Sequence, residues 1–394
     1  MKVAVVVQRY GEEIGAGAEQ LALGLAEHLL ALADVTVLTT CALDYRTWAN
    51  HYPAGETVLN GVTVRRFPVD RARDWARFQR LSSTAATLSS APLQQQLAWM
   101  AEQGPFSTEL FAELERAYPL YDVFIFVTYV YAHTYYGLPL VSDKAILVPN
   151  AHEEPYLYLP LVRPLFHLPR AIMYNTKTEM RLVNRVTRNG YRTHDAVAGV
   201  GITAPTSGSA GRFREKYGIQ GDFLLYVGRI DEAKNVPALL DAYRRYQADR
   251  PESPPLVLIG TPHFPIPGHP KIIPLGFVSE QDKFDAMRAA SVFLMPSLYE
   301  SLSIVVLEAW LMECPVLVNG HCEVLKQQCR DSQGGLYYGS YDEFAAALDL
   351  LLQREDLRKA LGRQGRAFTE KRYSWDAILD QYRRAFDYIS SHRA

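Results

Sequence analysis

The sequence contains little cysteine, no long apolar run and almost no net charge. Only 4 of its 394 residues are cysteines, too few for a disulfide-stabilised scaffold and typical of a reducing compartment. No apolar run approaches the roughly 20 residues that a transmembrane helix needs, and the run Val3 to Val7 is too short for the core of a signal peptide. We therefore expect a cytoplasmic protein, with peripheral contact at the inner face of the membrane as an open alternative.

Charge and ligand spacing exclude two further classes. The 41 Lys and Arg residues against 43 Asp and Glu residues give a net charge of −2, which disfavours a nucleic-acid binder. Cys314, His321, Cys322 and Cys329 lack the paired C-x2-C spacing of zinc sites, and no Asp-x-Asp motif occurs in a suitable loop. We predict no bound metal and no cofactor.

The composition is that of a globular protein with room for two domains. Apolar residues make up 48% and charged residues 21% of the chain. At roughly 150 residues per domain, two domains are favoured over one. Residues 203–211 are rich in Gly, Pro and Ser and are the best linker candidate. We therefore predict domains at 1–204 and 205–375.

Both halves alternate short apolar strands with amphipathic helices. In the first half, the run 3–7 is followed by a glycine-bearing loop, a helix with one apolar stripe from 18 to 29 and a strand at 35–39. Further strands are predicted at 123–128, 145–148, 223–227, 256–259, 292–295 and 315–318. This α/β pattern predicts two doubly wound, Rossmann-like domains facing across a cleft, with ligands beyond the carboxyl ends of the strands.

A basic turn follows the first strand of the second half. Gly228, Arg229 and Lys234 lie between the strand 223–227 and a helix predicted at 236–247. A glycine lets the backbone approach a ligand closely, and two cations beside a helix N-terminus suit a pyrophosphate group. The alternative is a solvated turn with two surface charges.

Two glutamates flank the start of a later helix. Glu300 follows the strand 292–295 and can bind a sugar hydroxyl, while the backbone amides of residues 301–304 can bind phosphate. Glu308 lies in the apolar stretch 304–312, where an acid is costly to bury unless something satisfies it. We favour a functional pair over a loop acid and a polar helix position.

These residues belong to an ordered set of motifs that resembles the family 4 retaining glycosyltransferases of the GT-B fold, essentially from end to end. Where the family usually has an aromatic residue and a glycine, this sequence has Leu302 and Ser303, and Ala16 stands where a second adjacent glycine is usual. These departures concern the geometry of phosphate contact. The motifs are Gly15-Ala-Gly-Ala-Glu19, Asn150-Ala-His152-Glu-Glu-Pro155, Gly228-Arg229 to Lys234, Gly276-Phe277-Val278 and the E-x7-E pair Glu300 and Glu308.

The resemblance implies a role for each matching residue. Arg229 and Lys234 would bind the donor diphosphate, Glu300 the hydroxyls of the donor sugar, and Glu308 the nucleotide ribose. His152 would lie at the reacting centre, which makes His152, Arg229, Lys234 and Glu300 the implied catalytic set. The remaining donor contacts would come from Gly15 and Gly17 at the phosphates, from Gly228, Ser301, Leu302 and Ser303, and from Gly276, Phe277 and Val278 at the base.

The implied reaction moves a hexose-type sugar from a UDP- or GDP-sugar to a hydroxyl of a glycan, lipid-linked or small-molecule acceptor, in cell-envelope polysaccharide synthesis. No carboxylate pair flanks the anomeric carbon, so the implied route is front-face attack with retention and without metal. One alternative is a non-catalytic sugar-nucleotide-binding partner subunit on the same fold. An NAD-dependent oxidoreductase is disfavoured because Gly15-x-Gly17-x-x-Gln20 lacks the third glycine of the dinucleotide fingerprint.

Three features outside these motifs are less specific. Tyrosines after two strand ends can stack on a sugar, although packing within the domain is their commoner role, and His133 lies among them. The segment 65–80 is rich in arginine and is a candidate contact for an anionic membrane or lipid-linked acceptor, against an exposed charged face. The final helix, 376–394, would pack back on the first domain, by resemblance. The tyrosines are 129, 131, 135, 136, 156 and 158, and the arginines are 65, 66, 71, 73, 77 and 80.

Overall fold

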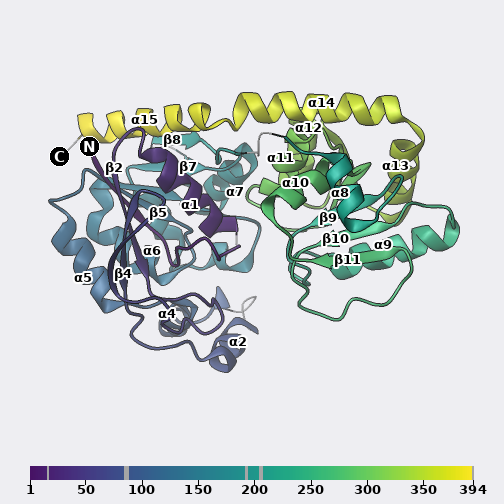
Figure 1. Cartoon of the computed structure of the whole chain (residues 1–394). Coiled ribbons are helices and arrows are strands. Elements are labelled where there is room, and N and C mark those ends of the chain that lie inside the picture. Colours follow the sequence, from purple (N-terminus) through teal and green to yellow (C-terminus); the bar gives the residue numbers. More distant parts are fainter. Residues whose placement is uncertain (16, 84–87, 191–193, 204–206, 393–394) are drawn as a thin grey trace. The chain divides into compact units, whose positions relative to one another are not determined.

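The chain folds into two compact α/β units. A computed structural model describes residues 1–15, 17–83, 88–190, 194–203 and 207–392. Unit 1 comprises Met1–Gly201 and Trp375–Ala394, and unit 2 comprises Ile202–Ser374 (Figure 1). Ala16, the predicted domain boundary at 204/205 with part of the linker, and the last two residues of the helix 376–394 lie outside the described residues.

Unit 1 is built on one mostly parallel sheet. Its described strands are β1 (Lys2–Val6), β2 (Asp34–Thr40), β3 (Gly55–Leu59), β4 (Val62–Phe67), β5 (Val123–Val127), β6 (Ala145–Val148), β7 (Ala171–Tyr174) and β8 (His194–Val197). The strand order is β3-β4-β2-β1-β5-β6-β7-β8, and only β3 pairs antiparallel with its neighbour. Every residue of β5 is buried, as expected for a strand with helices on both faces of its sheet.

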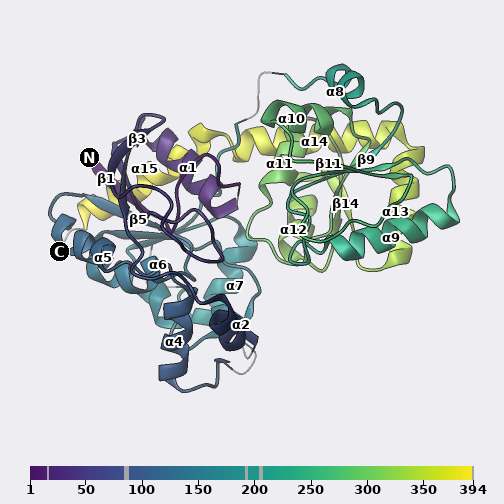
Figure 2. The ribbon, with the colours of Figure 1, turned by 60° about the horizontal axis from the view of Figure 1, so that its bottom comes forward.

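Helices cover both faces of this sheet. Figure 2 shows α1 (Gly17–Leu29) and α15 (Trp375–Ser391) on one face and α5 (Thr108–Ala117) and α6 (Ala132–Gly137) on the other. The other described helices of unit 1 are α2 (Trp75–Ser83), α4 (Leu93–Gln103), α7 (Lys177–Thr187) and the 3-10 helices η1 (Leu138–Lys144), η2 (Pro155–Tyr158) and η3 (Arg163–His167).

The last helix returns to the first half of the chain. Helix α15 packs against α1 and β8 and buries an apolar stripe that includes Ile378, Tyr382 and Phe386. At its start, the ring of Trp375 stacks on His28 of α1 with 3.7 Å between ring centroids. The expectation that this helix packs on the first half is confirmed, and burial of the stripe is the physical reason.

Unit 2 is built on a sheet in which all described neighbours pair in parallel. Its strands are β9 (Leu224–Val227), β10 (Leu256–Ile259), β11 (Ile272–Gly276), β12 (Val292–Met295), β13 (Val316–Asn319) and β14 (Gly335–Tyr338), in the order β11-β10-β9-β12-β13-β14. The order reverses between β9 and β12, which lie side by side although 64 residues lie between Val227 and Val292 in the sequence. Such a switch point is where ligands bind in open parallel sheets.

The helices of unit 2 follow the alternation predicted from the sequence. They are α8 (Ala210–Tyr217), α9 (Val236–Asp249), α10 (Glu280–Ala289), α11 (Ile304–Leu311), α12 (Glu323–Ser332), α13 (Tyr341–Gln353) and α14 (Glu355–Arg372) among the described residues. Large aromatic side chains such as Tyr243, Tyr246 and Phe344 fill the core beneath α9 and α13.

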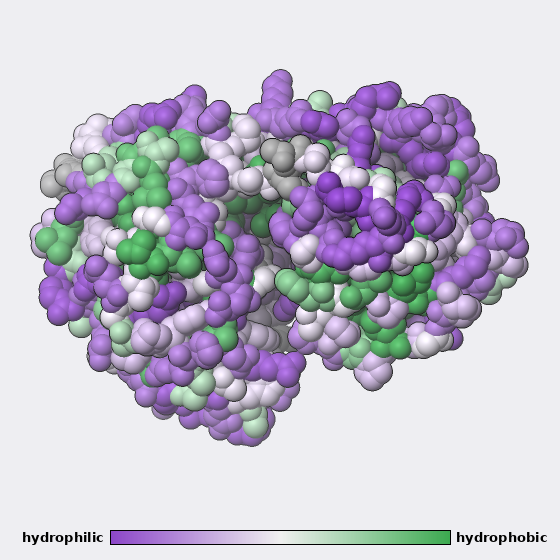
Figure 3. All heavy atoms as spheres, in the orientation of Figure 1, coloured by the Kyte–Doolittle hydropathy of each residue, from purple (hydrophilic) through white to green (hydrophobic). Residues whose placement is uncertain are grey.

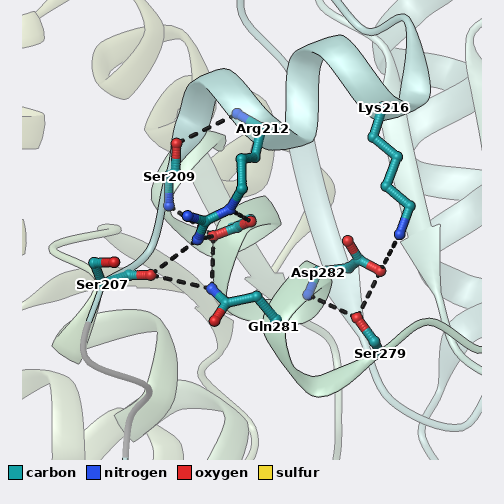
Figure 4. A network of polar contacts seen from close by, with 8 residues as sticks. Ser207, Ser209, Arg212, Lys216, Ser279, Gln281 and Asp282 are labelled. Carbon is teal, nitrogen blue, oxygen red and sulfur yellow. Dashed lines mark hydrogen bonds and ion pairs between the residues drawn. The ribbon is translucent and has the colours of Figure 1, made fainter.

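A polar network ties the end of the linker and the start of α8 to α10 (Figure 4). The carboxylate of Asp285 is almost fully buried and accepts hydrogen bonds from the backbone N–H of Ser209 at 2.6 Å and from Nε and Nη2 of Arg212 at 2.7 Å each. The side chain of Gln281 donates both to Asp285 and to the carbonyl of Ser207. The surface over α8 is hydrophilic (Figure 3), and beneath it the buried ring of Phe213 stacks on Phe223, so apolar packing adds to the polar network.

Replacing Asp285 by asparagine is expected to destabilise unit 2 by about 1–2 kcal/mol at pH 7, since a buried carboxylate loses charge-assisted hydrogen bonds whose partner Arg212 is half exposed. Burial by itself would raise the pKa of Asp285, but the hydrogen bonds from Arg212, Ser209 and Gln281 outweigh it and lower the pKa below its usual value. The stabilisation is therefore complete above the unfolded pKa of about 4 and is lost progressively as the pH falls through the lowered folded pKa. Thermal unfolding from pH 7 to about pH 2 measures this.

Asp342→Asn is the matched control, because the Asp342 side chain is 91% exposed on the same unit. We expect this change to leave the unfolding midpoint almost unaltered at every pH. An equal loss of stability in the two variants would contradict the assigned network. A loss of stability in Asp285→Asn that persists unchanged at low pH would contradict it as well.

Candidate functional site

Glycines bring three strand ends of unit 2 unusually close together. Gly228 follows β9 with φ 147°, and Gly260 follows β10 with φ 139°. The N–H of Gly228 donates to the carbonyl of Ile259 at 3.0 Å, and the N–H of Gly260 donates to that of Gly276 at 2.8 Å. A Cβ atom on Gly260 would lie 1.9 Å from the Gly228 carbonyl oxygen, so no side chain fits there. This backbone shapes the turn that carries the predicted cations.

The loop from β9 to α9 carries both cations. The Arg229 side chain is 47% exposed, and its Nε lies 3.4 Å from Oδ2 of Asp231. Oδ1 of Asp231 accepts the backbone N–H of Lys234 at 2.8 Å. Asn235 has a left-handed backbone with φ 58°, and its Nδ2 donates to the carbonyl of Pro296 in the loop after β12. These bonds fasten the two loops at the switch point to each other.

Lys234 and Glu300 meet although 66 positions separate them in sequence. Nζ of Lys234 donates to Oε1 of Glu300 at 2.7 Å, and the two side chains are 28% and 10% exposed. They meet because β9 and β12 are neighbours and both loops leave the carboxyl edge of the sheet. The structure thus unites a cation and a carboxylate that the sequence placed in separate motifs.

Helix α11 begins directly after this carboxylate. Its first residue is Ile304, and the preceding Ser303 is buried with a hydroxyl that makes no hydrogen bond within the described residues. The backbone amides at the start of a helix lack partners in the helix itself, so they suit an anion. Ser301, Leu302 and Ser303 form the turn that leads into the helix, as the sequence predicted.

Glu308 is buried inside α11 and has a partner that the sequence did not indicate. Nζ of Lys283 in α10 donates to its Oε1 at 2.8 Å, whereas Oε2 is buried without a hydrogen bond among the described residues. Burial raises the pKa of Glu308, and the Lys283 ammonium partly offsets this rise. Lys283 belongs to no quoted motif and looked like an ordinary polar residue of an amphipathic helix, so only the fold identified it.

The segment Gly276 to Val278 leaves the end of β11. Gly276 has φ 71°, and the side chain of Phe277 is 84% exposed. Val278 is half-buried and leads to Ser279, which caps α10 by accepting the N–H of Asp282 at 3.1 Å. This segment therefore presents an exposed aromatic ring at the same carboxyl edge as the cations.

The glycine loop and His152 belong to unit 1. Gly15 and Gly17 are exposed, and a Cβ at either position would contact nothing within 4 Å. Glu19, just inside α1, is buried and bound by Nε of Arg9 at 2.9 Å. The sequence analysis had not identified Arg9.

His152 follows β6 with a ring that is 32% exposed, and its Nδ1 lies 3.8 Å from Oε2 of Glu154.

The tyrosines of unit 1 pack within their own unit. Tyr129 is fully buried and donates to Oε1 of Glu154 at 2.6 Å, while the ring of Tyr156 stacks on Trp99. His133 is also buried, with Nε2 2.9 Å from the carbonyl of Val127, and burial lowers its pKa to about 4. These contacts favour the packing role for the tyrosines and a structural role for His133. Tyr131 packs on Trp48, and Tyr135 and Tyr136 pack on each other.

Most of the arginines in segment 65–80 bind internal partners. Arg65 pairs with Glu113, and Arg71 and Arg77 share Oε1 of Glu102. Arg66 and Arg73 are buried and donate to backbone carbonyls, those of Tyr10 and Glu102 among them. These pairings give no support to a membrane patch in this segment. Among the described residues, no helix combines the length and apolarity needed to cross a bilayer.

Comparison with known proteins finds a family model that matches most of unit 2. Residues 210–368 match the family model described as Glycosyl transferases group 1. A D-inositol 3-phosphate glycosyltransferase of Geodermatophilus obscurus is 26% identical over 272 residues, 63% of this chain and 59% of that protein. An alpha-D-kanosaminyltransferase of Streptomyces kanamyceticus is 28% identical over 196 residues, 45% of this chain and 49% of that protein. The chain thus spans about half the length of the curated relatives it matches.

Solved structures share the whole fold. Sucrose-phosphate synthase from Thermosynechococcus elongatus superposes with a TM-score of 0.70 at 15% identity, over 99% of both chains. HepE of Anabaena, in complex with UDP and glucose, gives 0.70 at 15% identity over 98% of this chain and 99% of its own. WaaG, a glycosyltransferase involved in lipopolysaccharide biosynthesis, gives 0.64 at 16% identity, over 98% and 99%. The chain therefore has the GT-B fold, and its residues 210–368 match the glycosyl transferases group 1 family model, in agreement with the resemblance seen in its sequence.

Proposed function

We propose that the protein is a retaining glycosyltransferase that moves a hexose-type sugar from a nucleotide diphosphate sugar to a hydroxyl group of an acceptor. The observation that carries this proposal is the Lys234–Glu300 pair at the switch point of unit 2, beside the Gly228 turn and Arg229. A cation for phosphate and a carboxylate for sugar hydroxyls lie side by side there. The family of unit 2 and the UDP-glucose complex of the structurally similar HepE support the same donor class.

Each part of the donor has a proposed contact. Arg229, Lys234 and the amides at the start of α11 bind the diphosphate, and Glu300 binds hydroxyls of the sugar. The buried Oε2 of Glu308 accepts from the ribose, and the segment Gly276 to Val278 borders the base. From unit 1, His152 acts at the reacting centre, and the loop with Gly15 and Gly17 contacts the phosphates.

The proposed chemistry is front-face substitution. The bond between the anomeric carbon and the diphosphate oxygen breaks while the acceptor oxygen bonds to the same face of that carbon. The acceptor proton passes to the departing phosphate, whose new negative charge is stabilised by Lys234, Arg229 and the amides of α11. The acceptor is a glycan, a lipid-linked sugar or a small molecule, and the likeness to WaaG supports a role in envelope polysaccharide synthesis.

The experiment is an incubation of the full chain with radiolabelled UDP- and GDP-sugars, with and without acceptors of the three classes. We expect release of nucleoside diphosphate from one donor, slowly as hydrolysis and faster with the correct acceptor, and NMR of the product should show the retained anomer. Binding of a sugar nucleotide with no turnover for any acceptor would instead support a non-catalytic partner subunit. Failure of every UDP- and GDP-sugar to bind would overturn the donor site.

Turnover is expected to be independent of divalent metal, because Lys234 and Arg229 supply the positive charge at the diphosphate. An excess of EDTA should leave kcat and the donor KM within about twofold of a sample that contains magnesium. Loss of activity with EDTA and its recovery with Mg²⁺ or Mn²⁺ would contradict this part of the proposal.

A further inference from the structure

Glu179 is a buried acid whose contacts exceed what its own helix needs. It lies in the first turn of α7 and is fully buried. Its Oε1 accepts the N–H of Ala151 at 2.6 Å, and its Oε2 accepts the N–H of Asn175 at 2.6 Å. Among the described residues it forms no ion pair, and burial raises the pKa of Glu179 to about 8 against the lowering effect of these bonds. Keeping such a group in the interior is costly unless both oxygens are satisfied.

Capping of α7 accounts for only part of this arrangement. Thr176 precedes the helix, and its hydroxyl accepts the N–H of Glu179 at 3.0 Å. The return bond from the Glu179 carboxylate to Asn175 is local and resembles a capping box. The bond to Ala151 is different, since it reaches 28 positions back to the loop that follows β6. The bond to Ala151 does not cap α7, so its role must concern the loop after β6.

Hydrogen bonds tie the loop after β6 to the ends of the neighbouring strands β5 and β7. Asn150 has a left-handed backbone with φ 51°, and its Nδ2 donates to Oγ1 of Thr128 at the end of β5. Nδ2 of Asn175, at the end of β7, donates to Oδ1 of Asn150 at 2.7 Å. Thr128 itself has φ 73°, a rarely populated conformation for a β-branched residue. Hydrogen bonds through Thr128, Asn150 and Asn175 thus join the ends of β5, β6 and β7, and the backbone N–H of Asn175 extends them to Glu179.

His152 directly follows the residue that Glu179 binds. The carbonyl of His152 accepts the N–H of Glu154 at 2.7 Å, and its ring faces the Glu154 carboxylate. On the other side of that carboxylate, the hydroxyl of Tyr129 donates to Oε1 of Glu154 at 2.6 Å. The backbone before His152 and the carboxylate beside its ring are therefore both fixed, and Glu179 supplies the first of these constraints.

We infer that Glu179 is a positioning residue that sets the direction of the His152 ring by binding the backbone N–H of Ala151. This inference rests on the proposed function, in which His152 acts at the reacting centre. Glu179 itself touches neither donor nor acceptor. A small misplacement of a reacting group lowers the rate of the chemical step far more than it weakens binding elsewhere.

The test compares Glu179→Gln with Thr176→Ala. Glutamine has the same shape, but its NH2 group can accept no hydrogen bond, so one of the two backbone bonds is lost. We expect kcat to fall about 10- to 100-fold, while the donor KM stays within about twofold, because most of the proposed donor contacts lie in unit 2 and the loop with Gly15 and Gly17 is left unaltered. Thr176→Ala weakens the helix cap without removing the bond to Ala151, so its kcat should stay within about twofold of the unaltered chain.

A second readout does not require turnover. The rate at which diethyl pyrocarbonate modifies His152, followed by peptide mass spectrometry, should change at least threefold in Glu179→Gln and not in Thr176→Ala. His51, exposed elsewhere in unit 1, is the internal reference. If no sugar nucleotide is turned over by the unaltered chain, the proposed function fails, and the modification rate alone decides the positioning role. Equal behaviour of the two variants, or no change in either readout, would overturn the inference.

Discussion

Lys234→Met is expected to lower kcat by a factor of about 10² to 10³, the range observed when one preorganised donor to a developing anion is removed. The substitution keeps the aliphatic stem and removes only the ammonium group. In the proposed reaction this group faces the diphosphate as it departs, so the loss falls mainly on the transition state. Initial rates at saturating donor, with the unfolding midpoint measured in parallel, give the comparison.

The matched control is Lys359→Met on the same unit. The Lys359 side chain is 65% exposed on α14 and, within the described part of the chain, pairs only with Glu355 one turn before it, so removing its charge should leave kcat unchanged. Lys234→Arg should recover part of the rate, because the charge is kept but its geometry differs. Near-normal turnover in Lys234→Met, with the fold intact, would refute the donor-site assignment.

Gly260→Ala is expected to destabilise unit 2 by about 3 kcal/mol or more, from overpacking and backbone strain together. The new Cβ would lie 1.9 Å from the carbonyl oxygen of Gly228, a backbone atom that no side-chain rotation can move away. In addition, Gly260 has φ 139°, where an alanine is strained. Relief requires β9 and β10 to separate just where Arg229 and Lys234 begin their loop. Thermal unfolding and donor binding should both reveal the change.

Gly268→Ala provides the control for that experiment. A Cβ at Gly268 meets nothing within 4 Å, so the same chemical change should shift the unfolding midpoint very little. If Gly260→Ala unfolds at the same temperature as the unaltered chain and binds donor equally well, the close approach of the two strand ends is not needed for the site.

The sequence predicted most of the buried strands and few of the exposed ones, although the buried strand β7 was also missed. The apolar runs at 223–227, 256–259 and 292–295 became β9, β10 and β12 because strands buried on both faces are apolar throughout. The hairpin of β3 and β4 was missed. Most of β3 is exposed, so it has no apolar pattern to detect. The edge strand β14 was missed as well, and it too is only partly buried.

Sequence motifs identified part of the candidate site, and long-range contacts that no motif records make up the rest. Spacing and resemblance pointed to Arg229, Lys234, Glu300 and Glu308. They did not point to Lys283, because its contact with Glu308 depends on the packing of α10 against α11. Glu179 was equally hidden, since its second bond joins strand ends that no sequence pattern relates.

The arginine-rich segment is a second case in which composition alone did not reveal the contacts. The sequence has six arginines between residues 65 and 80 with few acidic residues nearby, which suggested a charged surface. The fold brings Glu102 and Glu113 from α4 and α5 to Arg71 and Arg65, so much of that charge is compensated inside unit 1.

By itself, the sequence determined the fold class and the two α/β halves, because these depend on local hydrophobic periodicity. Its resemblance to a known family supplied the motif residues and the return of the last helix. The tertiary structure alone decided which charges meet. Strand order placed β9 beside β12 and so joined Lys234 to Glu300, and helix packing supplied Lys283 to Glu308. The physical reason is that a salt bridge acts over a few ångströms of space, whereas a sequence pattern records only distance along the chain.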